Sequence, residues 1–229
     1  KAIGGHSFKT GCIQTDIYIN HNTFETVGIA ININDFNNLN VTNNDSRSCR
    51  QFLISENVNN NSSNLNVTGN THVGYYVNST EGLGDERFIT LNANGYKGDL
   101  RIMFVNITNN HISSCGGHAI GYTAEYVTVA NNDFFNIARH GIYHYGGLCG
   151  SIIGNTFKDT GKEDSRYAIV IGNNSGESSK AVTVSNNSIA NLRGIQVGSN
   201  VVGVVVSSNV GQVVNGDTSG CTSANNVTI

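Results

Sequence analysis

The amino-acid sequence predicts an all-β protein in which short coils of chain stack on one another. Three observations lead to this prediction: asparagine recurs at a nearly constant spacing, runs of alternating or β-branched residues lie between the asparagines, and the 229-residue chain contains no proline. Average usage would give about ten prolines in a chain of this length. Because interior strands need their backbone N–H groups for the ladder, the absence of proline favours strands throughout.

The repeat is marked by an asparagine that follows a strand-like run, as in VTNND (41–45), VANND (129–133) and VSNNS (184–188). The asparagines at this corner are Asn22, Asn44, Asn70, Asn110, Asn132, Asn155, Asn187 and Asn209. Their separations are 22, 26, 40, 22, 23, 32 and 22 residues, which gives a basic unit of about 22 residues with insertions. A second motif, exemplified by GIYHY (141–145), keeps step with the first.

Each unit is too short for a strand-helix-strand module, yet it contains three strand-like runs broken by Asn and Gly. Stacking the units would form three parallel sheets around a core, with adjacent coils about 4.8 Å apart. Asparagine suits the corner because it tolerates left-handed backbone and its amide can bond to the equivalent amide one coil away. We therefore expect about eight coils of three short strands with an internal asparagine ladder.

The whole chain, residues 1–229, is predicted to form a single domain. Residues 1–16 contain no clear coil and are expected to be a partial coil or cap. The segments 71–87 and 156–166 are expected to be loop insertions, and long loops are often functional. An exposed apolar edge after the last coil would be unfavourable. For that reason we expect the chain to be a fragment of a longer protein, or to be capped by another chain.

The repeat resembles the right-handed parallel β-helix superfamily, which includes pectate lyases, related polysaccharide lyases and hydrolases, and bacteriophage tailspikes. The resemblance covers the chain from about Ile17 to Val214. It implies that the asparagine ladder lies between the second and third sheets. It also implies that substrate lies along the first sheet, here the GIYHY-type strands, and along the turn before it. Such a fold hosts several activities, so the site must decide between them.

Alternation within these strands predicts which side chains point into the core. The first inward column is predicted to be Ile29, Phe52, Ile89, Ile120, Ile142, Ile169 and Ile195. The second is predicted to be Ile31, Ile54, Leu91, Tyr122, His144, Ile171 and Val197. His144 is accordingly expected to be a buried, hydrogen-bonded structural histidine, whereas Tyr143 and Tyr145 are expected to share an exposed face.

The turn before each strand carries cationic or aromatic residues two positions ahead of the inward residue. These are Arg50, Arg87, His118, His140 and Arg193, with Tyr167 at the same position in a late coil and Arg166 beside it. A line of hydrogen-bond donors along one edge suits an acidic or hydroxyl-rich glycan, although each residue taken singly could instead cap a turn. Tyr143 and Tyr145 could provide stacking platforms for sugars. The predicted substrate-binding residues are Arg50, Arg87, Arg139, Tyr143, Tyr145, Arg166 and Arg193.

Cleavage of a glycan requires one of two sets of groups. A glycosidase needs two carboxylates that flank the bond, and Asp85, Glu86, Glu163 and Asp164 lie near the proposed face, with Glu56 and Glu125 as further carboxylates. A lyase needs a base and a cation, roles that His118, His140, Tyr143, Arg139, Lys162 and Arg166 could fill. The predicted catalytic residues are Asp85, Glu86, His118, His140, Glu163 and Asp164.

Other classes of partner are disfavoured by the composition. The net charge is −3, there is no polybasic stretch, and no apolar run is long enough to span a membrane, so neither nucleic acid nor membrane is expected as a partner. The five cysteines are odd in number and lack metal-ligand spacing. No metal and no cofactor are predicted.

The sequence thus favours a polysaccharide depolymerase of the phage tailspike type, a glycosidase, with a polysaccharide as substrate and a homotrimer as candidate assembly. Its expected location is the virion tail or, for a free enzyme, the extracellular space. One alternative is a polysaccharide lyase or uronate epimerase of the same superfamily. The other is a non-catalytic glycan-binding adhesin or structural spike.

Overall fold

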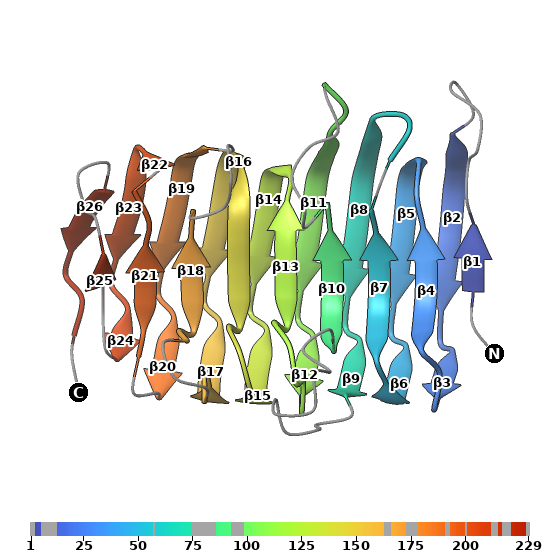
Figure 1. Cartoon of the computed structure of the whole chain (residues 1–229), viewed down its shortest axis with the longest axis horizontal. Coiled ribbons are helices and arrows are strands. Elements are labelled where there is room, and N and C mark those ends of the chain that lie inside the picture. Colours follow the sequence, from blue (N-terminus) through green and yellow to red (C-terminus); the bar gives the residue numbers. More distant parts are fainter. Residues whose placement is uncertain are drawn as a thin grey trace.

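The computed structural model describes residues 3–5, 13–56, 58–74, 86–92, 99–162, 166–172, 178–190, 193–199, 201–211, 215–216 and 221–227. Every regular element in these ranges is a β-strand, and all the paired strands are parallel. The strands stand side by side along the long axis, with the two chain ends at opposite ends of the molecule (Figure 1). The predicted all-β class and parallel stacking are confirmed, and the curled sheets are consistent with a parallel β-helix or solenoid.

The first and second sheets follow one another within each coil. The first sheet contains β1 (Ile3–Gly5), β4 (Ile29–Ile33), β7 (Gln51–Ser55), β10 (Arg87–Leu91), β13 (Ile120–Thr123), β16 (Ile142–Ile153), β18 (Ile169–Ile171), β21 (Ile195–Val197) and β25 (Asn215–Gly216). The second contains β2 (Gln14–Asn20), β5 (Phe36–Thr42), β8 (Ser62–Thr68), β11 (Ile102–Thr108), β14 (Glu125–Ala130), β19 (Ser179–Ser185), β22 (Val201–Val202), β23 (Val204–Ser207) and β26 (Cys221–Ala224). Strand β16 joins them, because it pairs with β18 of the first sheet and, further along, with β19 of the second.

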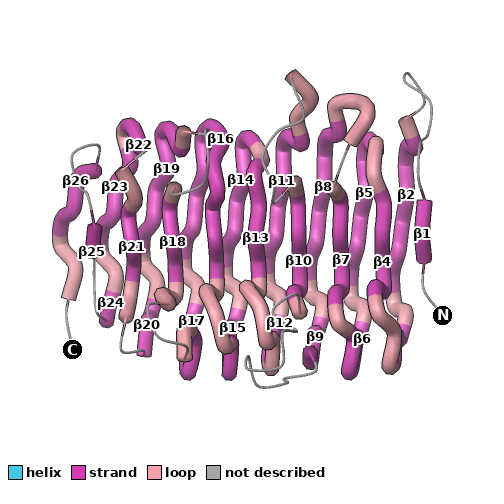
Figure 2. The backbone as a smooth tube through the Cα atoms, viewed as in Figure 1, coloured by secondary structure: helices cyan, strands magenta, loops and turns pink. Residues whose placement is uncertain are grey.

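The third sheet is separate. It contains β3 (Thr23–Glu25), β6 (Asp45–Cys49), β9 (Thr71–Gly74), β12 (His111–Ser113), β15 (Asp133–Ile137), β17 (Thr156–Thr160), β20 (Ser188–Ala190) and β24 (Val210–Gly211). Short described corners, such as residues 43–44 and 131–132, lead into it from the second sheet, as the tube drawing in Figure 2 shows. Strands β9 and β17 begin at Thr71 and Thr156, so the predicted insertions 71–87 and 156–166 start inside strands and their expected boundaries need correction.

The corner between the second and third sheets is built from two consecutive residues with different roles. The first residue adopts positive φ in coil after coil, for example Asn43 (52°), Asn109 (55°) and Asn131 (55°), a conformation that asparagine tolerates. The second is the repeated asparagine. Its Nδ2 donates to the Oδ1 of the next asparagine at 2.9–3.0 Å in an unbroken series from Asn22 to Asn226.

Each buried amide of this series is fully used. The Oδ1 of Asn132, for example, accepts from both the backbone N–H (3.0 Å) and the Nδ2 (2.9 Å) of Asn110. Its Nδ2 donates to the carbonyl of Ile107 at 2.9 Å and to Asn155 at 3.0 Å. Because no donor or acceptor is left unpaired, the asparagines can be buried without the penalty of unmade hydrogen bonds.

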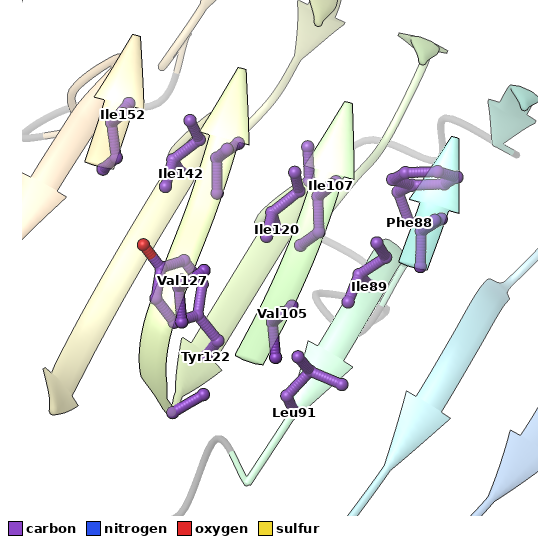
Figure 3. Packing of buried hydrophobic residues seen from close by; sticks show 14 of the residues in the cluster. Phe88, Ile89, Leu91, Val105, Ile107, Ile120, Tyr122, Val127, Ile142 and Ile152 are labelled. Atoms are coloured by element: carbon purple, nitrogen blue, oxygen red, sulfur yellow. The ribbon is translucent and has the colours of Figure 1, made fainter. Parts of the chain in front are cut away.

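The core consists of aliphatic and aromatic columns, and Figure 3 shows part of it between β10 and β16. One column of the first sheet runs in register through Ile31, Leu53, Ile89, Ile120, Ile142, Ile169 and Ile195. From Ile89 onward this is the predicted inward column. The prediction was wrong by two residues in β4 and by one residue in β7, where the pairing partners are Ile31 and Leu53 instead of Ile29 and Phe52.

The reason for the error is that Phe52 and Leu53 are both fully buried, so alternation cannot separate them. Leu53 lies opposite Ile89 in the sheet. Phe52 packs at the edge instead, where its ring stacks on Phe88 with centroids 5.0 Å apart and an interplanar angle of 7°.

Candidate functional site

A row of flat side chains lies along the turn between the third and first sheets. It consists of His118, His140, Tyr167 and Arg193 and is called the ring stack below. The imidazoles of His118 and His140 are stacked with centroids 4.9 Å apart and 14° between their planes. Tyr167 continues the stack 6.2 Å from His140, at 18°, and the Arg193 guanidinium lies 5.9 Å from the Tyr167 ring centroid.

The register of the first sheet brings these residues together. Each lies two positions before a core isoleucine, and the isoleucines Ile120, Ile142, Ile169 and Ile195 are direct partners in consecutive strands. An equal offset from paired residues places the side chains one coil apart. Arg50 does not join this row, because Gln51 is the residue that pairs with Arg87, and Arg50 is an exposed residue one position earlier.

Backbone hydrogen bonds fix which nitrogen of each histidine carries its proton. Nδ1 of His118 accepts the N–H of His140 at 3.2 Å, and Nδ1 of His140 accepts the N–H of Tyr167 at 2.9 Å. A backbone N–H can only donate, so each neutral ring has its lone pair on Nδ1 and its proton on Nε2. The lone pair that a general base would need is therefore already engaged in both residues.

Both imidazoles are held neutral near pH 7. Burial lowers the pKa of His118 well below its ordinary value. Positive charge on His140, when that ring is protonated, and on Arg87, Arg139 and Arg166 lowers the pKa further. Burial also lowers the pKa of His140, to about 4, with Arg166 and Arg139 adding to the effect. Once protonated, Nδ1 of His140 can donate to the carbonyl oxygen of Tyr167 at 3.2 Å, which opposes this shift without overcoming it.

Three of the predicted substrate-binding arginines converge on the ring stack. Arg87, Arg139 and Arg166 are each partly buried, and each is close enough to His118 to act on its titration. They come from three of four consecutive coils: Arg87 opens β10, Arg139 precedes β16, and Arg166 precedes β18, with the His118 coil between the first two. Each of the three residues also interacts with other groups of the protein. The cationic edge expected from the sequence is thus assembled from these three residues and Arg193.

Tyr143 and Tyr145 lie beside the stack and contact one another, with ring centroids 4.1 Å apart. The Tyr143 ring meets both imidazoles edge-on at 5.1 Å. The prediction of a shared face is right, but that of exposure is wrong for Tyr145, which is 7% exposed. Burial raises the pKa of both phenols.

A β-bulge explains the burial of Tyr145. Tyr122 pairs with His144 but the next residue, Thr123, pairs with Gly146, which leaves Tyr145 as an extra residue in β16. Its ring lies over Gly121, where an added Cβ would come within 3.0 Å of the ring. Bulges of this kind redirect a side chain, and here the ring is directed toward the preceding coils.

Among the predicted carboxylates, Glu86 has a structural partner. Its side chain is 3% exposed, and its Oε2 accepts the backbone N–H of Gly116 at 3.1 Å. The geometry is that of a cap on the turn before β13. Asp85, Glu163 and Asp164 lie outside the described residues. Glu125 belongs to the second sheet, where it pairs with Arg101 at 3.3 Å, and Lys162 donates to Asn136 at 2.6 Å.

Glu56 lies near Tyr145, although it is not among the catalytic residues predicted from the sequence. It follows β7, its backbone N–H donates to Asn34 at 2.9 Å, and its side chain is near enough to Tyr145 to contribute to that residue's raised pKa, alongside larger effects. Its position immediately after a first-sheet strand was the available signal. His144 is fully buried and touches Tyr122 edge-on at 4.9 Å, so its predicted burial is confirmed. The predicted hydrogen bond is not found, because neither ring nitrogen has a partner in the described part of the chain.

Within the described ranges, no three His, Cys, Asp or Glu side chains are grouped in a way that could hold a metal ion. No helix long and apolar enough to cross a membrane occurs there either. Comparisons with models of protein families, with curated protein sequences and with solved structures gave no match. The site must therefore be interpreted from its own chemistry.

Proposed function

We propose that this protein binds an acidic polysaccharide along the turn between its third and first sheets and cleaves it as a glycoside hydrolase. The observation that carries the proposal is the ring stack, in which flat rings and guanidinium groups repeat once per coil beside Arg87, Arg139 and Arg166. Aromatic faces suit the apolar faces of sugars, and guanidinium groups suit carboxylates in pairs of hydrogen bonds. A linear polymer matches a site that repeats along an axis.

The histidine geometry favours hydrolysis over elimination. A lyase would use a side-chain base to remove a proton, but the Nδ1 atoms of His118 and His140 already accept backbone N–H groups. Hydrolysis needs two carboxylates instead. We assign these to Asp85, which adjoins Glu86 in the sequence, and to Glu163 or Asp164, which lie three and two residues before Arg166.

The proposal extends to the finer fold and to the biological setting. The amide-to-amide series from Asn22 to Asn226 supports membership of the right-handed parallel β-helix superfamily, with about eight coils and an internal asparagine ladder. We propose the tailspike form, assembled as a homotrimer on a virion tail, ahead of a secreted enzyme. Its tests are the oligomeric state in solution and the handedness in an experimental structure.

The test of the activity is incubation of the whole chain with a panel of acidic polysaccharides. Hydrolysis predicts new reducing ends without the ultraviolet absorbance of an unsaturated uronide, whereas that absorbance would show elimination. Asp85→Asn and the pair Glu163→Gln with Asp164→Asn should abolish product formation. Glu25→Gln, on the exposed face of β3, is the matched control and should retain full activity. A panel that is bound and left intact would refute cleavage.

Binding without cleavage is the second candidate. It is favoured by two observations on the described part of the chain. Glu86, at this edge, accepts the Gly116 N–H, and Glu56 lies after the opposite end of β7. An adhesin or structural spike would retain affinity for a glycan and release no product. In that case the three carboxylate substitutions would leave the measured affinity unchanged.

A further inference from the structure

The two stacked histidines each keep one polar atom that the protein does not use. His118 is 6% exposed and His140 is 4% exposed, so both rings are more than nine-tenths buried. Nδ1 is engaged in each ring. In the described part of the chain, Nε2 of each ring has no hydrogen-bond partner, and it keeps some solvent-accessible surface. The small exposed area of each ring therefore includes a polar edge.

The bond at Nδ1 decides what that edge offers. With the lone pair on Nδ1, Nε2 carries the hydrogen and is a donor. The two donors have the same chemistry because the same backbone bond is repeated one coil later. The rings are nearly parallel, at 14°, and 4.9 Å apart, so their N–H groups are held side by side. Tyr143 packs edge-on against both rings and fixes them as a pair.

A pair of parallel N–H donors suits an acceptor with at least two oxygens on one centre. A carboxylate or a sulfate ester can place a separate oxygen against each donor, while a single hydroxyl can satisfy only one well. Positive charge also acts on the pair: that of Arg139 and Arg166 on both rings, and that of Arg87 on His118. Hydrogen bonds to an ionised acceptor are about twice as strong as those between neutral groups.

From this geometry we infer that His118 and His140 form a two-donor site for the oxyanion of the glycan, a carboxylate or sulfate group, and that they determine specificity without transferring a proton. This inference rests on the proposed function for the identity of the polymer. It assigns both residues a role other than the acid or base expected from the sequence. Both donors are in place before a ligand binds, because backbone hydrogen bonds fix the two rings.

Long-range ¹H–¹⁵N NMR of the full chain tests the arrangement of protons directly. The resonances of the two rings are identified by their loss in His118→Gln and His140→Gln. At neutral pH both rings should be uncharged, with hydrogen on Nε2 and none on Nδ1. A charged ring, or hydrogen on Nδ1 in either residue, would overturn the inference before any ligand is added.

Titration with small probes then tests the oxyanion site. Sodium glucuronate and sodium sulfate are compared with glucose at constant ionic strength. The Nε2 signals of both histidines should move with one or both anions and remain still with glucose. Movement with glucuronate alone identifies a carboxylate site, and movement with sulfate alone identifies a sulfate site. The absence of movement with both anions would overturn the inference.

Matched substitutions separate donation from structural support. Leucine and glutamine both remove the Nδ1 acceptor, but glutamine keeps an N–H donor near the position of Nε2. His118→Leu and His140→Leu should each weaken binding of the effective anion about tenfold, the loss expected for one hydrogen bond to a charged group. The glutamine variants should stay much closer to the wild type. Equal losses in the two sets, with equal thermal unfolding temperatures, would contradict a donor role.

These measurements can refute the oxyanion site and the proposed function separately. If no acidic polysaccharide is bound or cut but the Nε2 signals respond to the anions, the oxyanion site stands and the proposed function falls. If a polysaccharide is cut while those signals stay still, the proposed function stands and the inference falls.

Discussion

The buried histidine His144 predicts that the protein loses stability in mild acid, and the size of the loss can be worked out. Its ring is fully buried against Tyr122, and neither ring nitrogen has a partner in the described part of the chain. Burial lowers its pKa from the ordinary 6.5 to about 3. In the unfolded chain the ring binds a proton below about pH 6.5, whereas in the folded chain it binds one only below about pH 3.

The sign follows from linkage. Between about pH 6.5 and about pH 3 the unfolded state binds more protons, so the free energy of unfolding falls as the pH falls. One such histidine contributes about 1.4 kcal/mol per pH unit, or about 2 kcal/mol between pH 6.5 and pH 5. His72, which burial also shifts to a pKa of about 3, and His140, shifted to about 4, add to the same loss. Several such terms are comparable with the whole stability of a domain.

The decisive variant is His144→Leu, measured by urea unfolding with circular dichroism at about pH 7.5 and about pH 5. The difference in unfolding free energy between the two pH values should be smaller in the variant than in the wild type by about 2 kcal/mol. His111→Leu, on an exposed position of β12, controls for removing a surface histidine. Identical pH dependence in the wild type and in His144→Leu would refute the reasoning, because it would mean that the buried ring titrates alike in both states.

Three further substitutions test other parts of the structure. Asn132→Ala leaves the buried N–H groups of Asn110 without an acceptor and should lower the unfolding free energy in urea by about 3 to 5 kcal/mol. A loss below about 1 kcal/mol would show that the amide series does not stabilise the fold. Gly154 has a φ of 68°, and a Cβ added there would lie 2.6 Å from Oδ1 of Asn131, so Gly154→Ala should lower the unfolding free energy in urea by about 1 to 3 kcal/mol. Gly28 has open space around it, so Gly28→Ala should leave the unfolding free energy nearly unchanged. Glu86→Ala removes the acceptor of the Gly116 N–H and should lower the unfolding free energy by about 1 to 3 kcal/mol. Glu86→Gln keeps an acceptor oxygen and should retain most of that stability. Equal losses in the two variants would show that this hydrogen bond is not the cause.

The fold class could be predicted from the sequence because two strong local signals agree. Alternating β-branched runs specify strands, and asparagine at a fixed spacing specifies a corner that only stacking can repeat. Register was harder to predict. In β7 both Phe52 and Leu53 are apolar, and the choice between them depends on Ile89 in the next coil, which is a tertiary contact.

A bend inside the second sheet was only partly predictable from residue types. One residue per coil there adopts positive φ, and in successive coils it is Asp16, Asn38, Asn64, Phe104, Tyr126, Cys149, Ala181 and Gly203. Asp, Asn and Gly accept that conformation, but the other four residues disfavour it, so the neighbouring coils must impose it there. Phe104 and Tyr126 stack at 5.1 Å and are 50% and 44% exposed. The stacked coils thus override local preference at this position.

The position of the ring stack was more predictable than the chemical state of its residues. A constant offset from the core isoleucines is visible in the sequence, and it is enough to place His118, His140 and Arg193 in one row. The state of the imidazoles could not be read in the same way, because it depends on which backbone N–H of the next coil meets Nδ1. The bulge that redirects Tyr145 is likewise a property of the pairing between β13 and β16.

At two corners of the coil, side chains accept backbone N–H groups of a neighbouring coil. The two corners differ in whether the same side chains keep a free hydrogen-bond donor. At the asparagine corner, side-chain oxygens accept backbone N–H groups of a neighbouring coil, and the carboxamide has no remaining donor. At the corner before the first sheet, Glu86, His118 and His140 accept the N–H groups of Gly116, His140 and Tyr167. An imidazole that caps a turn through Nδ1 still has a hydrogen on Nε2. Histidine at such a corner can therefore support the fold and face a ligand at the same time, which asparagine in the buried series cannot do.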